Sequence, residues 1–180
     1  MSKPGCAAPG DNRSVNDGQR IVELIPRLRR YARALVGDRA RADDLVQDTL
    51  ERAWNKFHLW RPGSDLRAWL FTVMHNVHVN QVRASRDHAM LDHDSEEMAV
   101  APVQGAALEI RDLERALALI PAEQREVLLL IALEDMSYAE VANALGIPIG
   151  TVMSRLSRAR EKLRGLMYGV AVNTKLQVVK

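Results

Sequence analysis

The chain is poor in cysteine and in aromatic residues, with one cysteine, Cys6, and eight aromatic side chains among 180 residues. A single cysteine excludes an internal disulfide, and proteins without disulfides are typical of the reducing cytoplasm. No apolar run reaches the length of about 20 residues that a membrane-spanning helix needs. The first ten residues are rich in glycine and proline and lack the apolar centre of a signal peptide. We therefore expect a cytoplasmic protein that begins with a disordered tail over residues 1–18.

Motifs of catalysis and of metal binding are absent as well. The sequence contains no glycine-rich phosphate loop and no nucleophile motif with a partner base. His75 and His78 are three residues apart on one predicted helix, which brings only two ring nitrogens together, and no cysteine is close to them. We predict that the chain is not an enzyme and that it binds no metal and no cofactor.

Charge is distributed unevenly, although the net charge is only +2. The stretch 20–90 holds 13 basic and 8 acidic residues, whereas the stretch 91–106 holds four acidic residues and no lysine or arginine. The acidic stretch also contains a proline and a glycine. This change of composition indicates a folded unit followed by a linker.

Hydrophobic side chains recur at helical spacing over residues 20–166, and no stretch shows the alternation of a strand. Aspartate and serine, which favour the starts of helices, stand at the expected boundaries. Asp38 is expected to cap the second helix, and Ser64 or Asp65 the third, which should end near Ala84. The sequence therefore predicts an all-α protein.

Two small helical domains joined by a flexible acidic linker account for this pattern. We place the first domain at 19–87, the linker at 88–106 and the second domain at 107–168, followed by an apolar tail at 169–180. Fully extended, such a linker spans about 60 Å. The two domains are thus expected to reach separated sites.

The segment 137–164 has the pattern of a helix-turn-helix. Ser137 and Glu140 match a capping box, in which each side chain accepts a hydrogen bond from the other residue's backbone N–H. Gly146 is suited to end the first helix, and Pro148 is suited to begin the second. In such a unit the second helix enters the major groove of DNA.

The second helix of this unit has one apolar face and one basic face. Its apolar residues recur at i, i+4, i+7 and i+11, and they are Val152, Leu156, Ala159 and Leu163. Residues 151–168 include five lysines and arginines but a single acidic residue. The combination favours a helix that packs on a core and presents positive charge to DNA.

Three segments, in this order, resemble bacterial sigma factors of the extracytoplasmic-function (ECF) group, group 4 of the sigma-70 family, which are reduced to regions 2 and 4. They are residues 43–54 (DDLVQDTLERAW), 66–76 (LRAWLFTVMHN) and 137–163 (SYAEVANALGIPIGTVMSRLSRAREKL). The likeness extends from about residue 20 to residue 164. It implies that 19–87 is region 2, that 107–168 is region 4, and that the protein directs RNA polymerase to promoters.

In region 4, the resemblance places the contacts with the promoter −35 element at the start of the recognition helix. The expected base readers are Ser154, Arg155 and Arg158, and the expected phosphate contacts are Thr151 and Arg160. Arginine can read guanine through two hydrogen bonds. The family usually has lysine or arginine where this chain has Met153, so one contact is expected to be missing.

In region 2, the third predicted helix is the candidate reader of the −10 element. A polar stripe at i, i+4, i+8 and i+11 consists of Thr72, Asn76, Asn80 and Arg83. Amide groups can donate and accept hydrogen bonds at the edge of an unstacked base, and arginine suits phosphate. The resemblance implies that Asn76 helps to hold a flipped base, in a pocket completed by a loop around 85–88. Trp69, by contrast, is expected to belong to the core.

The resemblance also implies partners. In the family, the second helix of region 2 docks on the clamp helices of the polymerase β′ subunit, and the matching acidic face here consists of Asp44, Gln47, Asp48 and Glu51. The implied partners are core RNA polymerase, through its β′ clamp helices and β subunit, promoter DNA, and an anti-sigma factor. No insertion into a membrane is expected.

Two other classes of protein fit parts of the pattern. A helix-turn-helix transcriptional regulator that is not a polymerase subunit would bind two-fold symmetric DNA sites by itself. A helical adaptor would use the basic helix for an acidic protein partner and would show no dependence on DNA sequence. A sigma factor instead binds DNA weakly alone and needs two unlike promoter elements, so co-purification with core polymerase separates the three.

Overall fold

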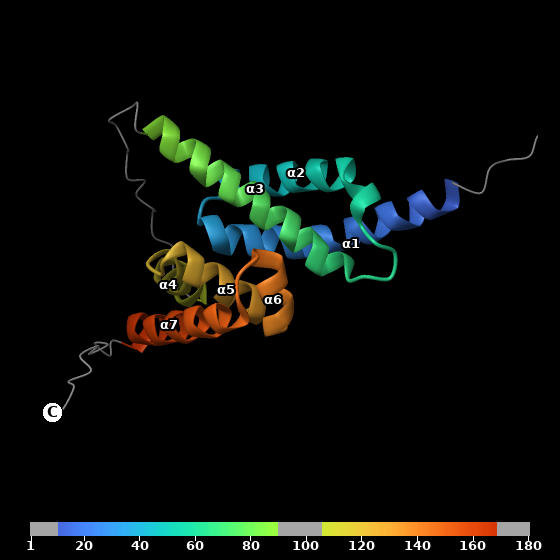
Figure 1. Ribbon diagram of the computed structural model, residues 1–180. Coiled ribbons are helices and arrows are strands. Elements are labelled where there is room, and N and C mark those ends of the chain that lie inside the picture. Colours follow the sequence, from blue (N-terminus) through green and yellow to red (C-terminus); the bar gives the residue numbers. More distant parts are fainter. Residues whose placement is uncertain (1–10, 90–105, 169–180) are drawn as a thin grey trace, which may run out of the picture.

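Within the described residues, 11–89 and 106–168, every regular element of the computed structural model is a helix (Figure 1). In chain order the helices are α1 (Asp11–Val36), α2 (Arg39–Asn55), the short 3-10 helix η1 (Phe57–Leu59), α3 (Leu66–Ala89), α4 (Ala106–Ala118), α5 (Ala122–Ala132), α6 (Tyr138–Leu145) and α7 (Ile149–Tyr168). The expected all-α fold class is therefore confirmed. Most of the expected linker and the whole expected C-terminal tail lie outside the described residues.

Side-chain caps and a left-handed glycine set the helix ends in the N-terminal half (α1 to α3). Gly37, with φ of 76°, follows the last residue of α1. The Asp38 carboxylate then accepts a hydrogen bond of 2.8 Å from the backbone N–H three residues later, as an N-cap does. At the start of α3, Asp65 accepts from the backbone N–H of Arg67, whereas Ser64 donates to a carbonyl of the preceding turn. Of the two expected caps for this helix, Asp65 is the one the structure uses.

Two helices are longer than the sequence predicts. α1 begins at Asp11, so residues 11–18 of the expected disordered tail are helical. A Cβ placed at Gly18 would lie 3.8 Å from the ring of Trp54, so this part of α1 runs beside the end of α2 and gains a packing surface from it. α3 continues to Ala89, and the loop expected around residues 85–88 is helical, because no glycine or proline interrupts that stretch.

The core of the N-terminal half lies where α1, α2 and α3 meet. Leu28, Leu45 and Met74, one from each helix, are fully buried. The rings of Tyr31 and Phe71 meet edge to face, with 5.0 Å between their centroids. Burying one such side chain stabilises the fold by about 1.5–3 kcal/mol, so this cluster fixes the orientation of α3 and of the polar residues on its other faces.

In the C-terminal half (α4 to α7), α7 packs against α4, α5 and α6. The fully buried residues Val127, Val141 and Val152 come from α5, α6 and α7 respectively. The apolar face predicted for the recognition helix is thus the face that meets the core, as Leu156 and Ala159 are also buried.

The two halves are packed against each other, which the sequence did not predict. α6 lies on α3, while α4 and α5 lie on α1, and the buried residues of both halves form one continuous cluster. The outer helices α2 and α7 lie on opposite sides of the molecule (Figure 1). None of the helices in the described part of the chain is long and apolar enough to span a membrane.

Candidate nucleic-acid interface

The predicted helix-turn-helix is formed by α6 and α7. The capping box of Ser137 and Glu140 is present: the Glu140 carboxylate accepts from the Ser137 backbone N–H at 2.7 Å, and the Ser137 hydroxyl accepts from the Glu140 N–H at 3.3 Å. Hydrogen bonds from Ser137 hold the pKa of Glu140 below its usual value. Gly146, with φ of 64°, ends α6 in the left-handed conformation and turns the chain into α7.

The solvent side of α7 carries most of the residues predicted to contact the −35 element. Arg158 lies on the face opposite the buried Val152 and Leu156. Of the five predicted residues, Ser154, Arg158 and Arg160 are exposed, whereas Thr151 and Arg155 are half-buried. Met153 is also exposed, with 48 % of its surface accessible, so an apolar side chain stands within this basic face.

Arg155 differs from the other basic residues of this face, because its guanidinium forms an ion pair with Glu123 in the first turn of α5. Its side chain is only 24 % exposed, whereas that of Glu123 is 72 % exposed. The sequence did not indicate this pair, because the two partners lie 32 positions apart. A DNA contact by Arg155 therefore has to compete with Glu123.

A hollow beside α7 brings in Tyr138 and Arg164, which were not among the predicted DNA contacts. It lies where the start of α6 approaches the middle of α7, and Tyr138, Met153, Arg160 and Arg164 are among its lining residues. The hollow is also lined by the acidic Glu161, which offsets part of the positive charge of the two arginines. The signal for Tyr138 was available in the sequence, as it follows directly after the capping serine.

The polar stripe of α3 lines a groove between α3 and the end of α2. Thr72, Asn76 and Asn80 contribute to its wall, whereas Arg83 lies further along the helix. The Thr72 hydroxyl donates to a backbone carbonyl of its own helix, and the Asn76 amide donates to the Thr72 carbonyl at 2.9 Å. These bonds fix the orientation of both side chains.

The opposite wall of this groove carries two cations, Arg52 and Lys56, which the sequence reasoning did not single out. Their spacing of four residues at the end of the second helix was the available signal. Trp69 also lines the groove, although it was expected in the core; it is half-buried and packs edge to face on Phe57, with 6.0 Å between the ring centroids. One groove thus offers amides, positive charge and an aromatic ring.

All four residues predicted to face the polymerase are exposed on α2. They lie opposite the buried Leu45, Val46 and Ala53, and they are Asp44, Gln47, Asp48 and Glu51. Gln81 of α3 donates a hydrogen bond of 2.8 Å to the Asp48 carboxylate. The acidic face is therefore fixed by α3 at one point and open to solvent elsewhere.

Two histidines of α3, His75 and His78, lie close to charged residues of α5. His75 Nδ1 lies 2.7 Å from a carboxylate oxygen of Glu126 on α5. Burial lowers the pKa of the neighbouring His78. No group of three or more metal-binding side chains occurs among the described residues.

Comparison with known proteins identifies the family. The family described as the Sigma2 domain of PhyR matches residues 21–75, and the family described as sigma-70, region 4, matches residues 110–163. The ECF RNA polymerase sigma factor EcfG of Rhodopseudomonas palustris is 40% identical over 151 residues, which cover 82% of this chain and 83% of EcfG. The chain belongs to the ECF RNA polymerase sigma factors. Members of this family are regulatory subunits rather than enzymes.

Solved structures agree with this assignment. The sigma factor RpoE of Bartonella quintana, in a co-crystal structure with the anti-sigma factor NepR, is similar to this sigma factor with a TM-score of 0.77 and 37% identity. That likeness covers 85% of this chain and 97% of the RpoE chain. CnrH, in complex with the cytosolic domain of CnrY, gives a TM-score of 0.65 at 28% identity, covering 90% and 92% of the two chains.

Proposed function

We propose that this ECF sigma factor binds core RNA polymerase and directs it to promoters, reading the −35 element as duplex through α7 and opening the −10 element at the groove beside α3. The observation that carries the proposal is the groove, because amides, cations and an aromatic ring together suit single-stranded nucleic acid. A regulator that read only duplex DNA would have no use for such a groove outside its helix-turn-helix.

At the −35 element, the solvent face of α7 would lie in the major groove. Ser154, Arg155 and Arg158 are the proposed base readers, with Thr151 and Arg160 as phosphate contacts. Their support is that the face is anchored from behind by buried residues and is exposed in front. A good two-bond contact between arginine and guanine contributes about 1–3 kcal/mol of discrimination.

At the −10 element, Asn76 and Asn80 are the proposed contacts with unstacked bases. Moving one base out of the stack costs a few kcal/mol, which a protein without a nucleotide cofactor has to recover from binding the single strand. The fixed Asn76 amide reduces the ordering cost, and Arg52 and Lys56 are placed to neutralise phosphates of that strand. Thr72 and Arg83 complete the proposed contact surface.

The acidic face of α2 is the proposed docking site for the β′ clamp helices of core polymerase. Acidic groups exposed on an otherwise basic half suit a basic partner, because complementary charge sets orientation and the rate of association. We also propose a contact with the β subunit, which the family resemblance implies. We propose regulation by an anti-sigma factor as well, because the similar sigma factor RpoE of Bartonella quintana is bound to the anti-sigma factor NepR in its solved structure.

Reconstituted transcription tests the proposed function. Core polymerase mixed with the full-length chain should give promoter-dependent run-off transcripts on genomic fragments that core polymerase alone ignores. Arg158→Ala should reduce this transcription, whereas Arg115→Ala, an exposed arginine on α4, should not. If no fragment gives a transcript above the level of core polymerase alone, the proposal is wrong; symmetric binding sites for the isolated chain would point to a regulator instead.

A further inference from the structure

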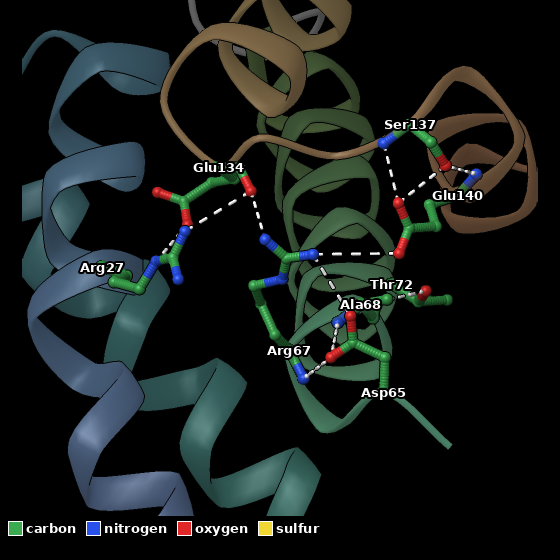
Figure 2. A network of polar contacts seen from close by, with 8 residues as sticks. All are labelled: Arg27, Asp65, Arg67, Ala68, Thr72, Glu134, Ser137 and Glu140. Carbon is green, nitrogen blue, oxygen red and sulfur yellow. Dashed lines mark hydrogen bonds and ion pairs between the residues drawn. The ribbon is translucent and has the colours of Figure 1, made fainter.

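One carboxylate of the C-terminal half, that of Glu134, is fully buried against the N-terminal half. Glu134 lies in the connection between α5 and α6, and its side chain is 0 % exposed. The next residue, Asp135, has φ of 51°, so the chain turns sharply at this point. Figure 2 shows Glu134 between Arg27 of α1 and Arg67 of α3.

Three arginines of the N-terminal half bind this one residue. Arg27 Nε donates to one carboxylate oxygen at 2.8 Å, and Arg30 donates to the other at 3.1 Å. Arg30 also donates to the Leu133 carbonyl at 2.7 Å. Arg67 donates to the backbone carbonyl of Glu134 (Figure 2). The side chain and the backbone of the same turn are thus both held by the other half.

Arg67 extends this contact to the helix-turn-helix. Its guanidinium lies 3.2 Å from the Asp65 carboxylate and 3.8 Å from the carboxylate of Glu140 (Figure 2). Asp65 caps the start of α3, and Glu140 belongs to the capping box of α6. One arginine therefore joins the start of α3 to the start of α6.

A second polar contact lies along the same interface. His75 of α3 meets Glu126 of α5, which is itself buried. Between the two contacts lies Tyr31, fully enclosed; burial first, and then the charges of Glu126 and Glu134, raise its pKa well above the usual value. The interface therefore combines the arginine contacts of Glu134 and the contact between His75 and Glu126 around an aromatic core.

The burial of a carboxylate together with its cations favours one arrangement of the two halves. A buried carboxylate that loses its cations is strongly destabilised, whereas the same group in water is not. Glu134 is consequently stable either in contact with the arginines or fully solvated, and intermediate arrangements are disfavoured. The docked state and a separated state are therefore distinct alternatives.

The docked state leaves both proposed DNA surfaces exposed but fixes them on one small body. α3 meets α6 on one face and lines the −10 groove with another, and α7 makes its helix contacts within the C-terminal half. The longest helix, α1, has 26 residues and spans about 39 Å at 1.5 Å per residue. Elements centred about 25 base pairs apart are separated by about 85 Å of duplex.

We propose that the docked arrangement is a closed state of the sigma factor, held by Glu134, which has to open before one molecule can contact both promoter elements. This inference rests on the proposed function for its consequence, but not for the existence of the closed state. Opening exposes the arginines and Glu134 to water and releases α4 to α7 as a unit.

Energy transfer between two dyes on the full-length chain tests the closed state without polymerase or DNA. The dyes would be attached at Ala40→Cys on α2 and Lys162→Cys on α7, two exposed positions on the outer helices, in a Cys6→Ser background. Glu134→Gln keeps the shape of the side chain but removes the charge, and we expect it to lower the ratio of closed to open molecules at least tenfold. Arg30→Gln should lower the ratio a few-fold.

Glu114→Gln is the matched control, as Glu114 is an exposed carboxylate on α4 and should leave the transfer efficiency at the parent value. High transfer in the parent that falls with Glu134→Gln supports the proposal. Low transfer efficiency in the parent overturns it. An unchanged transfer efficiency in Glu134→Gln also overturns it, provided that this variant keeps the circular dichroism spectrum of the parent. If Glu134→Gln loses its helical signal, Arg30→Gln decides: a fall supports the closed state and an unchanged value overturns it.

Run-off transcription at limiting sigma concentration then tests the consequence. The apparent affinity of a protein is reduced by the fraction that is not competent to bind, so Glu134→Gln should raise the transcript yield in proportion to its open fraction. Transcripts from the parent with no gain in the variant would overturn the gating role alone. Absence of transcripts from every chain would count against the proposed function and leave the transfer result intact.

Discussion

The ion pair between Arg155 and Glu123 leads to a prediction with an unusual sign: removing an acidic residue of α5 should strengthen DNA binding. In the free protein Arg155 is held by Glu123, and a contact with the −35 element has to break or share that pair. Glu123→Gln removes the competitor without shortening the side chain. It also removes a negative charge close to the proposed DNA surface.

The magnitude follows from exposure. Because the Glu123 side chain is 72 % exposed, solvent screens the pair, and such exposed pairs contribute about 0–1 kcal/mol. The gain on Glu123→Gln is therefore limited to about fivefold in affinity. Arg158→Ala, where no such competitor acts, should lose about 1–3 kcal/mol, or about 5–150-fold.

The assay is binding of holoenzyme to a −35 duplex at several salt concentrations. If Arg155 moves to a phosphate, the salt slope of Glu123→Gln steepens by about one unit; if it moves to a base, preference sharpens at one position. In an Arg155→Ala background, Glu123→Gln should keep only the small gain that comes from its lost negative charge, for which Glu114→Gln serves as the control. Weaker binding of Glu123→Gln would refute the reasoning, because it would mean that Glu123 orients Arg155 for reading.

Three other predictions concern the cap of α6, the −10 groove and a half-buried histidine. Ser137→Ala should lower the free energy of unfolding by about 1 kcal/mol in urea denaturation, with the exposed Ser157→Ala as control; an unchanged midpoint would contradict the capping role. The double change Asn76→Ala and Asn80→Ala should spare closed-complex formation but block strand opening, which permanganate footprinting measures. A template mismatched at −10 should partly restore transcription. Normal opening on paired DNA would show that the helix is only structural. Burial lowers the pKa of His78, so the unfolded chain takes up a proton more readily than the folded one. The free energy of unfolding should therefore fall as pH drops below about 6.5. His78→Gln should reduce that pH dependence. An identical pH profile for the variant would rule this out.

Local signals were sufficient for the helices and for the helix-turn-helix. The capping box at Ser137, the left-handed turn at Gly146 and the apolar face of α7 depend on neighbours within a few residues, and the structure confirms each of them. The predicted end of α3, near Ala84, is five residues too early, because the sequence around Ala84 has no strong stop signal.

Contacts between distant residues were not predictable in the same way. Glu134 stands in a polar stretch between two helices and resembles a solvated loop residue, yet it is buried by arginines 67 to 107 residues away. Arg52 and Lys56 look like ordinary exposed cations until α3 is placed opposite them. In each case the role comes from tertiary packing, for which a single sequence carries no periodic pattern.

The charge pattern across the two halves limits how freely they can be exchanged in evolution or in engineering. Region 2 contributes Arg27, Arg67 and His75, and region 4 contributes Glu126 and Glu134, in positions that match only as a set. A chimera that joins this region 2 to a region 4 without these two carboxylates would inherit one side of the set without the other. Under the proposed closed state, such a chimera would keep its promoter contacts but would lose closure unless the turn between α5 and α6 is transferred together with its arginines.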